Sequence, residues 1–161
     1  MNMDEPLHKE KEIMELRTQP HRKFVTSDHE GQSTGYLVPI YNIHDGFFAS
    51  GREPQQVYLT VVSPRSSKGP HLHFVRTGCF TCIKGNVRIV VKVDGQYREY
   101  DSGEAHDYLS IEIPVGTPAL IQNLGDEEAF VLNMPNPAWT PTMNDEHTAD
   151  FSDYRPSDTP S

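Results

Sequence analysis

The feature that most constrains the fold is a succession of short strand-like runs separated by turn residues. About ten runs rich in β-branched and aromatic residues follow one another between residues 23 and 134, with Gly, Pro, Asp or Asn between them. No stretch of helical periodicity separates these runs. Short strands in such close succession pair with one another, which predicts an all-β sandwich or small barrel.

The run NVRIVVKV, residues 86–93, shows what kind of strand is expected. Alternate residues from Val87 to Val93 share an apolar face, whereas Arg88 and Lys92 lie on the other face. An Asp-Gly pair at 94–95 follows, which is typical of a two-residue hairpin loop. We therefore expect a β-hairpin whose apolar face packs between sheets and whose cations point outward or toward a partner subunit.

The two ends of the chain depart from the strand pattern. Apolar residues in 6–19 lie on a loose helical stripe, and Pro20 would end such a helix. After Asn136 the chain is rich in Pro, Asp, Thr and Ser, which is typical of a surface segment that frays at its end. A length of 161 residues fits one domain. The expected parts are an N-terminal helical segment (1–20), a β-barrel (21–136) and an irregular C-terminal tail (137–161).

Composition limits the partners and the compartment. The formal net charge of −9 argues against nucleic acid or an anionic membrane as the main partner, because phosphate binding needs clustered Lys and Arg. No apolar run is long enough to cross a bilayer, and the charged first residues lack the apolar region of a secretory signal. Two cysteines in such a chain fit a reducing compartment. We therefore expect a cytoplasmic protein.

The stretch GPHLHFVRTGCFTCIKG, residues 69–85, holds the residues with the most reactive side chains. Because strand side chains alternate, His71 and His73 point to the same side. Two histidines so placed suit a metal site or a proton-transfer site, although they can also be polar residues of a core. Cys79 and Cys82 are an odd number of residues apart and face opposite sides, so they are expected to be buried and inert.

Three segments resemble the cupin superfamily, namely VVSPRSSKGPHLHF, IKGNVRIVV and SIEIPVGTPALIQNLGDEEAFVLNM. The resemblance is to the nucleotide-sugar branch, which includes dTDP-4-dehydrorhamnose 3,5-epimerases, dTDP-sugar ketoisomerases and the cupin domain of capsular-polysaccharide nucleotide-sugar enzymes. It covers Val57 to Met134, and K-G-x-H-x-H is among its most specific motifs. It implies a single jelly-roll barrel with the site inside, and a homodimer with an N-terminal strand exchanged or packed across.

The metal-binding cupin pattern is only half present. His71 and His73 fill its first two ligand positions, but the Glu position falls at Thr77 or Gly78 and the later His position near Ala119. A tight transition-metal site needs three or four protein ligands. We therefore expect no metal and no cofactor, unless the fold brings another histidine inward (His44, His106 or His147).

The epimerases of the branch work without metal, and the resemblance assigns roles to several residues. His71 stands at the position of the catalytic base, with His73 orienting or relaying the proton, and Lys68 at the position of a basic residue that faces the substrate. Further candidates for substrate binding are Arg76, Arg88, Tyr58 and Trp139. This sequence departs from the epimerase pattern in two places. Cys79 stands where the family has a lysine, and the segment PNPAWT lacks the tyrosine that acts as the family's acid.

The function that follows is an epimerase or isomerase for a nucleotide-linked keto-sugar, in cell-surface polysaccharide or deoxysugar biosynthesis. Protons beside the carbonyl of such a sugar are acidic, and a neutral imidazole can remove one near neutral pH. The alternatives are a metal-dependent cupin enzyme of the dioxygenase kind and a cupin that binds sugar without turnover.

Overall fold

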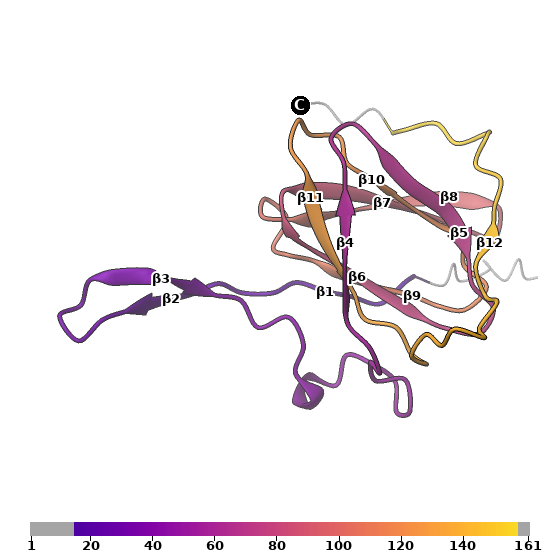
Figure 1. The fold of residues 1–161 in the computed structure, drawn as a ribbon. Coiled ribbons are helices and arrows are strands. Elements are labelled where there is room, and N and C mark those ends of the chain that lie inside the picture. Colours follow the sequence, from indigo (N-terminus) through magenta and orange to yellow (C-terminus); the bar gives the residue numbers. More distant parts are fainter. Residues whose placement is uncertain (1–14, 158–161) are drawn as a thin grey trace, which may run out of the picture.

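Two antiparallel five-stranded sheets face each other in a computed structural model, which describes residues 15–157 (Figure 1). One sheet has the order β1-β9-β6-β11-β4 and the other the order β12-β5-β10-β7-β8. The strands of the first sheet are β1 (Thr18–Gln19), β4 (Tyr58–Val62), β6 (Gly78–Lys84), β9 (Ser110–Ile113) and β11 (Ala129–Asn133). Those of the second are β5 (Ser67–Leu72), β7 (Asn86–Val93), β8 (Gln96–Gly103), β10 (Ala119–Gln122) and β12 (His147–Thr148).

This arrangement is the jelly-roll barrel that the sequence predicts. Apolar side chains from both sheets fill the space between them, among them Ile89 and Val91 of β7 and Val131 of β11, all fully buried. Arg88 and Lys92 of β7 lie on the opposite, outer face of that strand, as alternation requires. The core therefore lies toward one end of the barrel, and more polar side chains share the interior at the other end.

The hairpin predicted at the Asp-Gly pair is confirmed. β7 and β8 pair in continuous register from Asn86 opposite Gly103 to Val93 opposite Gln96. The loop residues Asp94 and Gly95 have φ angles of 50° and 76°, which is the left-handed backbone that this tight turn requires.

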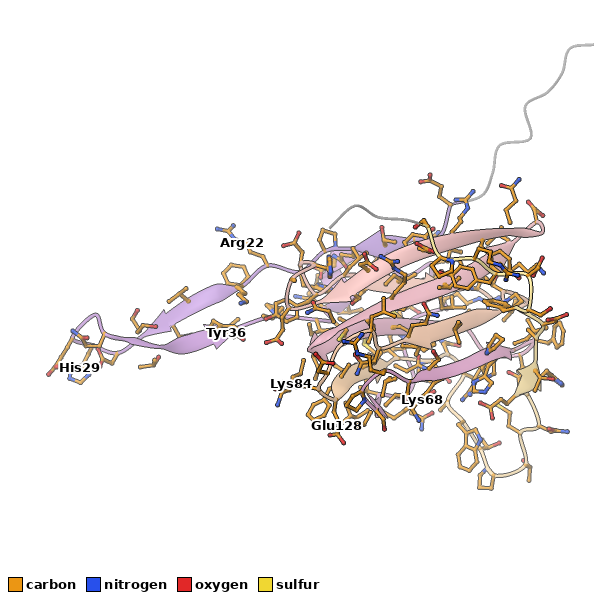
Figure 2. The ribbon with its side chains drawn as sticks, turned by 90° about the horizontal axis from the view of Figure 1, so that it is seen from above. Arg22, His29, Tyr36, Lys68, Lys84 and Glu128 are labelled. Atoms are coloured by element: carbon orange, nitrogen blue, oxygen red, sulfur yellow. The ribbon has the colours of Figure 1, made fainter. Side chains whose placement is uncertain are left out.

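A second hairpin projects from the barrel as an arm (Figures 1 and 2). It consists of β2 (Phe24–Ser27) and β3 (Ser33–Leu37), which form a separate two-stranded sheet. At its base the hydroxyl group of Tyr108 donates a hydrogen bond of 3.4 Å to that of Tyr36. His29 lies at the tip of the arm, far from Lys68 on the barrel (Figure 2). An isolated two-stranded hairpin is marginal in water, so this arm needs a further surface to pack on.

The prediction of an N-terminal helix is wrong for the part of it that the structure describes, from residue 15 on. Thr18 and Gln19 form β1, which pairs with Ile111 and Ser110 of β9, because that sheet edge satisfies their backbone groups. Residues 6–14 of the expected helix lie outside the described residues. The helical element within residues 15–157 is the 3₁₀ turn η1 (Ile43–Asp45). Across that range the chain forms no helix with the length and apolar character to span a membrane.

Both cysteines are unpaired and fully buried, as expected. Cys82 belongs to the apolar cluster between the sheets, whereas Cys79 lies on the other face of β6. Burial raises the pKa of the Cys79 thiol to about 12, with the charge of Glu112 adding to the effect. Burial likewise raises the pKa of Cys82 to about 11. Neither thiol forms the thiolate needed for metal binding or nucleophilic attack near neutral pH.

We therefore expect both cysteines of the native protein to resist a thiol-reactive probe at pH 8. Labelling should be roughly 100-fold slower than for an exposed thiol, because only the thiolate reacts. In denaturing urea both should react at once, which gives the control for probe and stoichiometry. Rapid labelling of even one cysteine under native conditions would contradict this burial.

Candidate functional site

A cavity of about 250 Å³ opens between the two sheets at the polar end of the barrel. β4, β5, β6 and β11 contribute to its walls, together with the turn before β10 and the segment after residue 136. Five residues predicted from the sequence line it: Tyr58, Lys68, His71, His73 and Arg76. The fold thus brings most of the candidate residues together around one space.

A bulge in β5 explains how Lys68 and His71 reach the same cavity. They are three positions apart, so a regular strand would send their side chains to opposite faces. The pairing with β10 slips here, since His71 lies opposite Ala119 and Lys68 opposite Ile121. Gly69 has a φ of +92°, and a Cβ there would lie 2.8 Å from the carbonyl oxygen of Ala119. Only glycine therefore fits this bulge.

His71 has a carboxylate partner. Its Nδ1 lies 3.3 Å from Oε1 of Glu146, a residue from the C-terminal segment that also lines the cavity. A carboxylate only accepts hydrogen bonds, so this contact favours a proton on Nδ1. The other ring nitrogen, Nε2, then carries the lone pair. Both side chains are about half exposed, so the pairing orients the ring more than it stabilises the fold.

His73 has a cationic partner instead. Nη2 of Arg76 lies 3.0 Å from Nε2 of His73. Burial lowers the pKa of His73, and the Arg76 guanidinium lowers it further, while the carboxylates of Asp145 and Glu146 act in the opposite direction. The two histidines thus differ in their environment although they are two residues apart.

Tyr58 is held by an amide from β11. Nδ2 of Asn133 donates a hydrogen bond of 2.6 Å to the Tyr58 hydroxyl oxygen, and Oδ1 of Asn133 accepts one from the amide of Cys79 at 3.1 Å. Since the tyrosine oxygen accepts, its own proton can be donated to a ligand. Asn133 also lines the cavity, and nothing in its sequence context predicted that role.

The C-terminal segment is more than the plain tail that its composition predicts. Asp145 is buried, and its carboxylate accepts hydrogen bonds of 2.8 to 3.0 Å from the amides of Phe74, Val75 and Arg76. Burial alone would raise the pKa of Asp145, but the three amide hydrogen bonds lower it below its usual value. The next residues form β12, which pairs with β5 and adds a strand to the second sheet. The sequence signal for a role of this segment at the cavity is the group of carboxylates near His147, namely Asp145, Glu146 and Asp150.

Two candidate binding residues lie elsewhere. Arg88 does not line the cavity, because its guanidinium forms ion pairs with Asp101 and Glu99 on the outer face of the second sheet. Trp139 is half exposed, and its backbone amide donates to the Gln56 side chain outside the cavity lining. A role of Trp139 in substrate binding stays a prediction.

The remaining positions of the metal-binding cupin pattern can be located in the structure. Ala119, where the later histidine of metal-binding cupins was expected, lies directly opposite His71. Thr77 and Gly78 line the cavity without offering a carboxylate. Between residues 15 and 157 no three His, Cys, Asp or Glu side chains gather closely enough to hold a metal ion.

The position at which Cys79 stands in place of the family's lysine supplies no charge to the cavity. Cys79 lies outside the cavity lining, and the neighbours on β6 that do line it are Gly78 and Phe80. No cation of β6 lines the cavity, so its positive charge comes from Lys68 and Arg76.

No protein-family model matches the sequence, and no curated protein matches it either. Solved structures do share its fold. A dTDP sugar isomerase from Desulfovibrio desulfuricans superimposes with a TM-score of 0.68 at 17% identity, over 85% of this chain and 88% of that one. A 3′-monoepimerase from Streptomyces bikiniensis, in complex with dTDP-quinovose, gives 0.67 at 17% identity over 88% and 73% of the chains.

A third structure represents the ketoisomerases. A sugar 3,4-ketoisomerase from Thermoanaerobacterium thermosaccharolyticum in complex with TDP gives a TM-score of 0.57 at 16% identity, over 78% of this chain and 85% of that one. At such identities the likeness establishes the fold, the jelly-roll barrel expected from the sequence motifs.

We expect Asp145→Asn to destabilise the protein at neutral pH. The asparagine amide cannot accept all three amide protons, and hydrogen bonds to a charged group are worth about 1.5–3 kcal/mol. Because the folded pKa of Asp145 is lowered, its contribution is present above the unfolded pKa and is lost as pH falls through the folded one. Urea unfolding at pH 7 and at about pH 3 should show the difference from wild type shrinking in acid.

The matched control is Asp126→Asn. Asp126 also accepts hydrogen bonds, in its case from the Arg65 guanidinium, but its side chain is 84% exposed. This variant should unfold at nearly the wild-type urea concentration at both pH values. If Asp145→Asn were equally neutral, the carboxylate would not be what holds the C-terminal segment.

Proposed function

We propose that this protein is an epimerase or isomerase that moves a proton on a nucleotide-linked keto-sugar without a metal. The observation that carries the proposal is the cavity in which His71, paired with Glu146, shares the walls with Tyr58 and Lys68. A base, an acid and a cation around one space are the groups that enolate chemistry requires.

The first step is removal of a proton from the carbon beside the sugar carbonyl. Nε2 of His71 accepts this proton, and the electron pair of the C–H bond moves into the carbonyl to form an enolate. Glu146 holds the Nδ1 proton, which keeps the ring oriented and stabilises the imidazolium that forms. A histidine is suited to this role because its pKa lies near the pH of the cell.

The second step returns a proton. Lys68 stabilises the negative enolate oxygen, and the hydroxyl group of Tyr58 donates a proton to carbon. Return to the opposite face of the same carbon inverts that carbon. If the proton goes instead to the former carbonyl carbon, the neighbouring hydroxyl group passes its own proton to the enolate oxygen. The carbonyl group then lies on the neighbouring carbon of the ring.

The solved structures with this fold support the class of substrate. Their names describe a dTDP sugar isomerase, a 3′-monoepimerase in complex with dTDP-quinovose and a sugar 3,4-ketoisomerase in complex with TDP. Lys68 and Arg76 give the cavity lining the positive charge that suits an anionic substrate.

The direct test follows solvent deuterium into the sugar. In deuterated water the protein should exchange a carbon-bound proton of one member of a panel of dTDP-, UDP- and GDP-4-keto sugars, read by NMR or mass. His71→Ala should slow this exchange by about 100-fold or more, because general base catalysis contributes about 10²–10⁴-fold.

His106→Ala is the matched control, since His106 is an exposed histidine outside this cavity. It should exchange at the wild-type rate. Absence of exchange with the whole panel, or an unchanged rate in His71→Ala, would refute the proposal. Binding of a nucleotide sugar without exchange would point instead to a sugar-binding protein.

We further propose that the protein acts as a homodimer in the cytoplasm. The arm exposes apolar side chains on both faces, with Val25 73% and Leu37 50% exposed. β4 forms an edge of the first sheet and exposes Leu59 and Val61 on its outer face. Packing the arm of one subunit across this edge of the other would cover both surfaces. The unpaired cysteines fit a reducing compartment.

The dimer is tested by charging the arm. Val25→Glu combined with Leu37→Glu should convert a dimer into a monomer in light scattering after gel filtration. Each buried apolar side chain contributes about 1.5–3 kcal/mol, so their loss weakens association by more than about 100-fold. Gln96→Glu, at an exposed residue of β8 in the second sheet, should remain dimeric. A wild-type protein that is monomeric at all concentrations would contradict the proposal.

A further inference from the structure

The contact between Arg76 and His73 determines where the proton of His73 lies. Nη2 of Arg76 lies 3.0 Å from Nε2 of His73. A guanidinium group carries N–H donors and no acceptor, and it stays protonated in proteins. Nε2 of His73 must therefore accept the hydrogen bond through its lone pair. A neutral ring with that arrangement carries its one proton on Nδ1.

The charges around His73 favour this neutral form. Protonation of Nε2 would break the contact with Arg76 and leave two cations about 3 Å apart, which is unfavourable in a half-buried site. The groups that act on the ring are His71 from β5, Arg76 from the following turn, and Asp145 and Glu146 from the C-terminal segment. The two carboxylates offset part of the repulsion, but burial and the guanidinium outweigh them.

Asp145 holds Arg76 in the required place. Its Oδ2 accepts the Arg76 amide at 3.0 Å, and its Oδ1 accepts the amides of the two preceding residues. The turn that connects His73 to Arg76 is thereby fixed at three consecutive backbone groups. The carbonyl oxygen of His73 is held as well, since it accepts the amide of Gly116 at 2.7 Å. These backbone contacts therefore hold the Arg76 guanidinium beside the His73 imidazole without help from a ligand.

We propose that Arg76 is a positioning residue that locks His73 as the neutral Nδ1–H tautomer, so that His73 serves as a hydrogen-bond donor and leaves His71 as the base. The donor role rests on the proposed function, because the oxygen that receives the hydrogen bond is the enolate oxygen of the keto-sugar. A neutral imidazole can polarise a carbonyl in this way. The two histidines of His-x-His then have opposite tasks: a carboxylate partners His71 and a guanidinium partners His73.

The lock is tested without substrate, by ¹⁵N–¹H correlation spectra of the histidine rings in the full chain. His73→Gln identifies the signals of His73. In wild type His73 should show Nδ1 protonated and Nε2 unprotonated, and it should stay neutral as pH falls through about 6.5, the ordinary pKa of histidine. Arg76→Leu should release the ring, with protonated Nε2 appearing and the titration midpoint of His73 moving upward.

Two further variants separate the lock from a general loss of structure. Arg76→Lys keeps a donor and should retain most of the Nδ1–H form. Arg65→Leu removes an arginine of a surface ion pair and should leave His73 unchanged. A wild-type His73 protonated on Nε2, or a tautomer and midpoint unaffected by Arg76→Leu, would overturn the proposal. Because no sugar is present, these results do not depend on turnover, so a failure of the proposed function would be recognised separately.

Discussion

The candidate site depends on one carboxylate that binds three consecutive amides. After β5 ends, the backbone of residues 74–76 directs three N–H groups toward one point, and the buried carboxylate of Asp145 accepts all of them. Unpaired amides at that position would each cost the free energy of a buried unsatisfied donor. The contact therefore satisfies the end of the strand and, at the same time, ties a segment about 70 residues later in the chain to it.

This attachment places the partners of both histidines. Glu146 follows Asp145 directly, and β12 continues along β5, so the second carboxylate lies beside His71. On the other side of the contact, the fixed turn presents Arg76 to His73. Farther along, Tyr154 donates to Glu99 of β8 at 2.5 Å, which holds the segment against the opposite edge of the same sheet. The segment thus forms part of the cavity wall and of the outer surface of the barrel.

The sequence predicts the barrel because strand periodicity and turn residues are local signals. The Asp-Gly hairpin, the apolar face of β7 and the inert cysteines all follow from residues close together in the chain. β1 and β12 were missed, because strands of two residues form only where a sheet edge already exists. The helix expected through Gln19 was wrong at its end for the same reason, since pairing with β9 outweighs a loose helical stripe.

The site was predictable as a set of residues but not as a set of contacts. The motif K-G-P-H indicated that Lys68 and His71 act together, but alternation alone separates them, and only the bulge at Gly69 unites them. Arg76 was a candidate for substrate binding. Its contact with His73 was not foreseen, because it depends on the turn that Asp145 fixes. Arg88 points outward, as alternation predicts, and its pairing there with Asp101 across the sheet depends on the register of β8.

Local charge, and not the overall charge, governs what this cavity attracts. The formal net charge of −9 would repel a nucleotide sugar, but exposed charges are screened beyond about 8 Å at physiological ionic strength. Among residues 15–157, the cavity lining contains the cations Lys68 and Arg76 and the carboxylate of Glu146. Since Glu146 pairs with His71 and Arg76 with His73, the same residue type has an anionic partner at one position and a cationic partner two residues later. A symmetric motif in sequence thereby becomes an asymmetric pair, which a reaction with separate proton acceptor and hydrogen-bond donor requires.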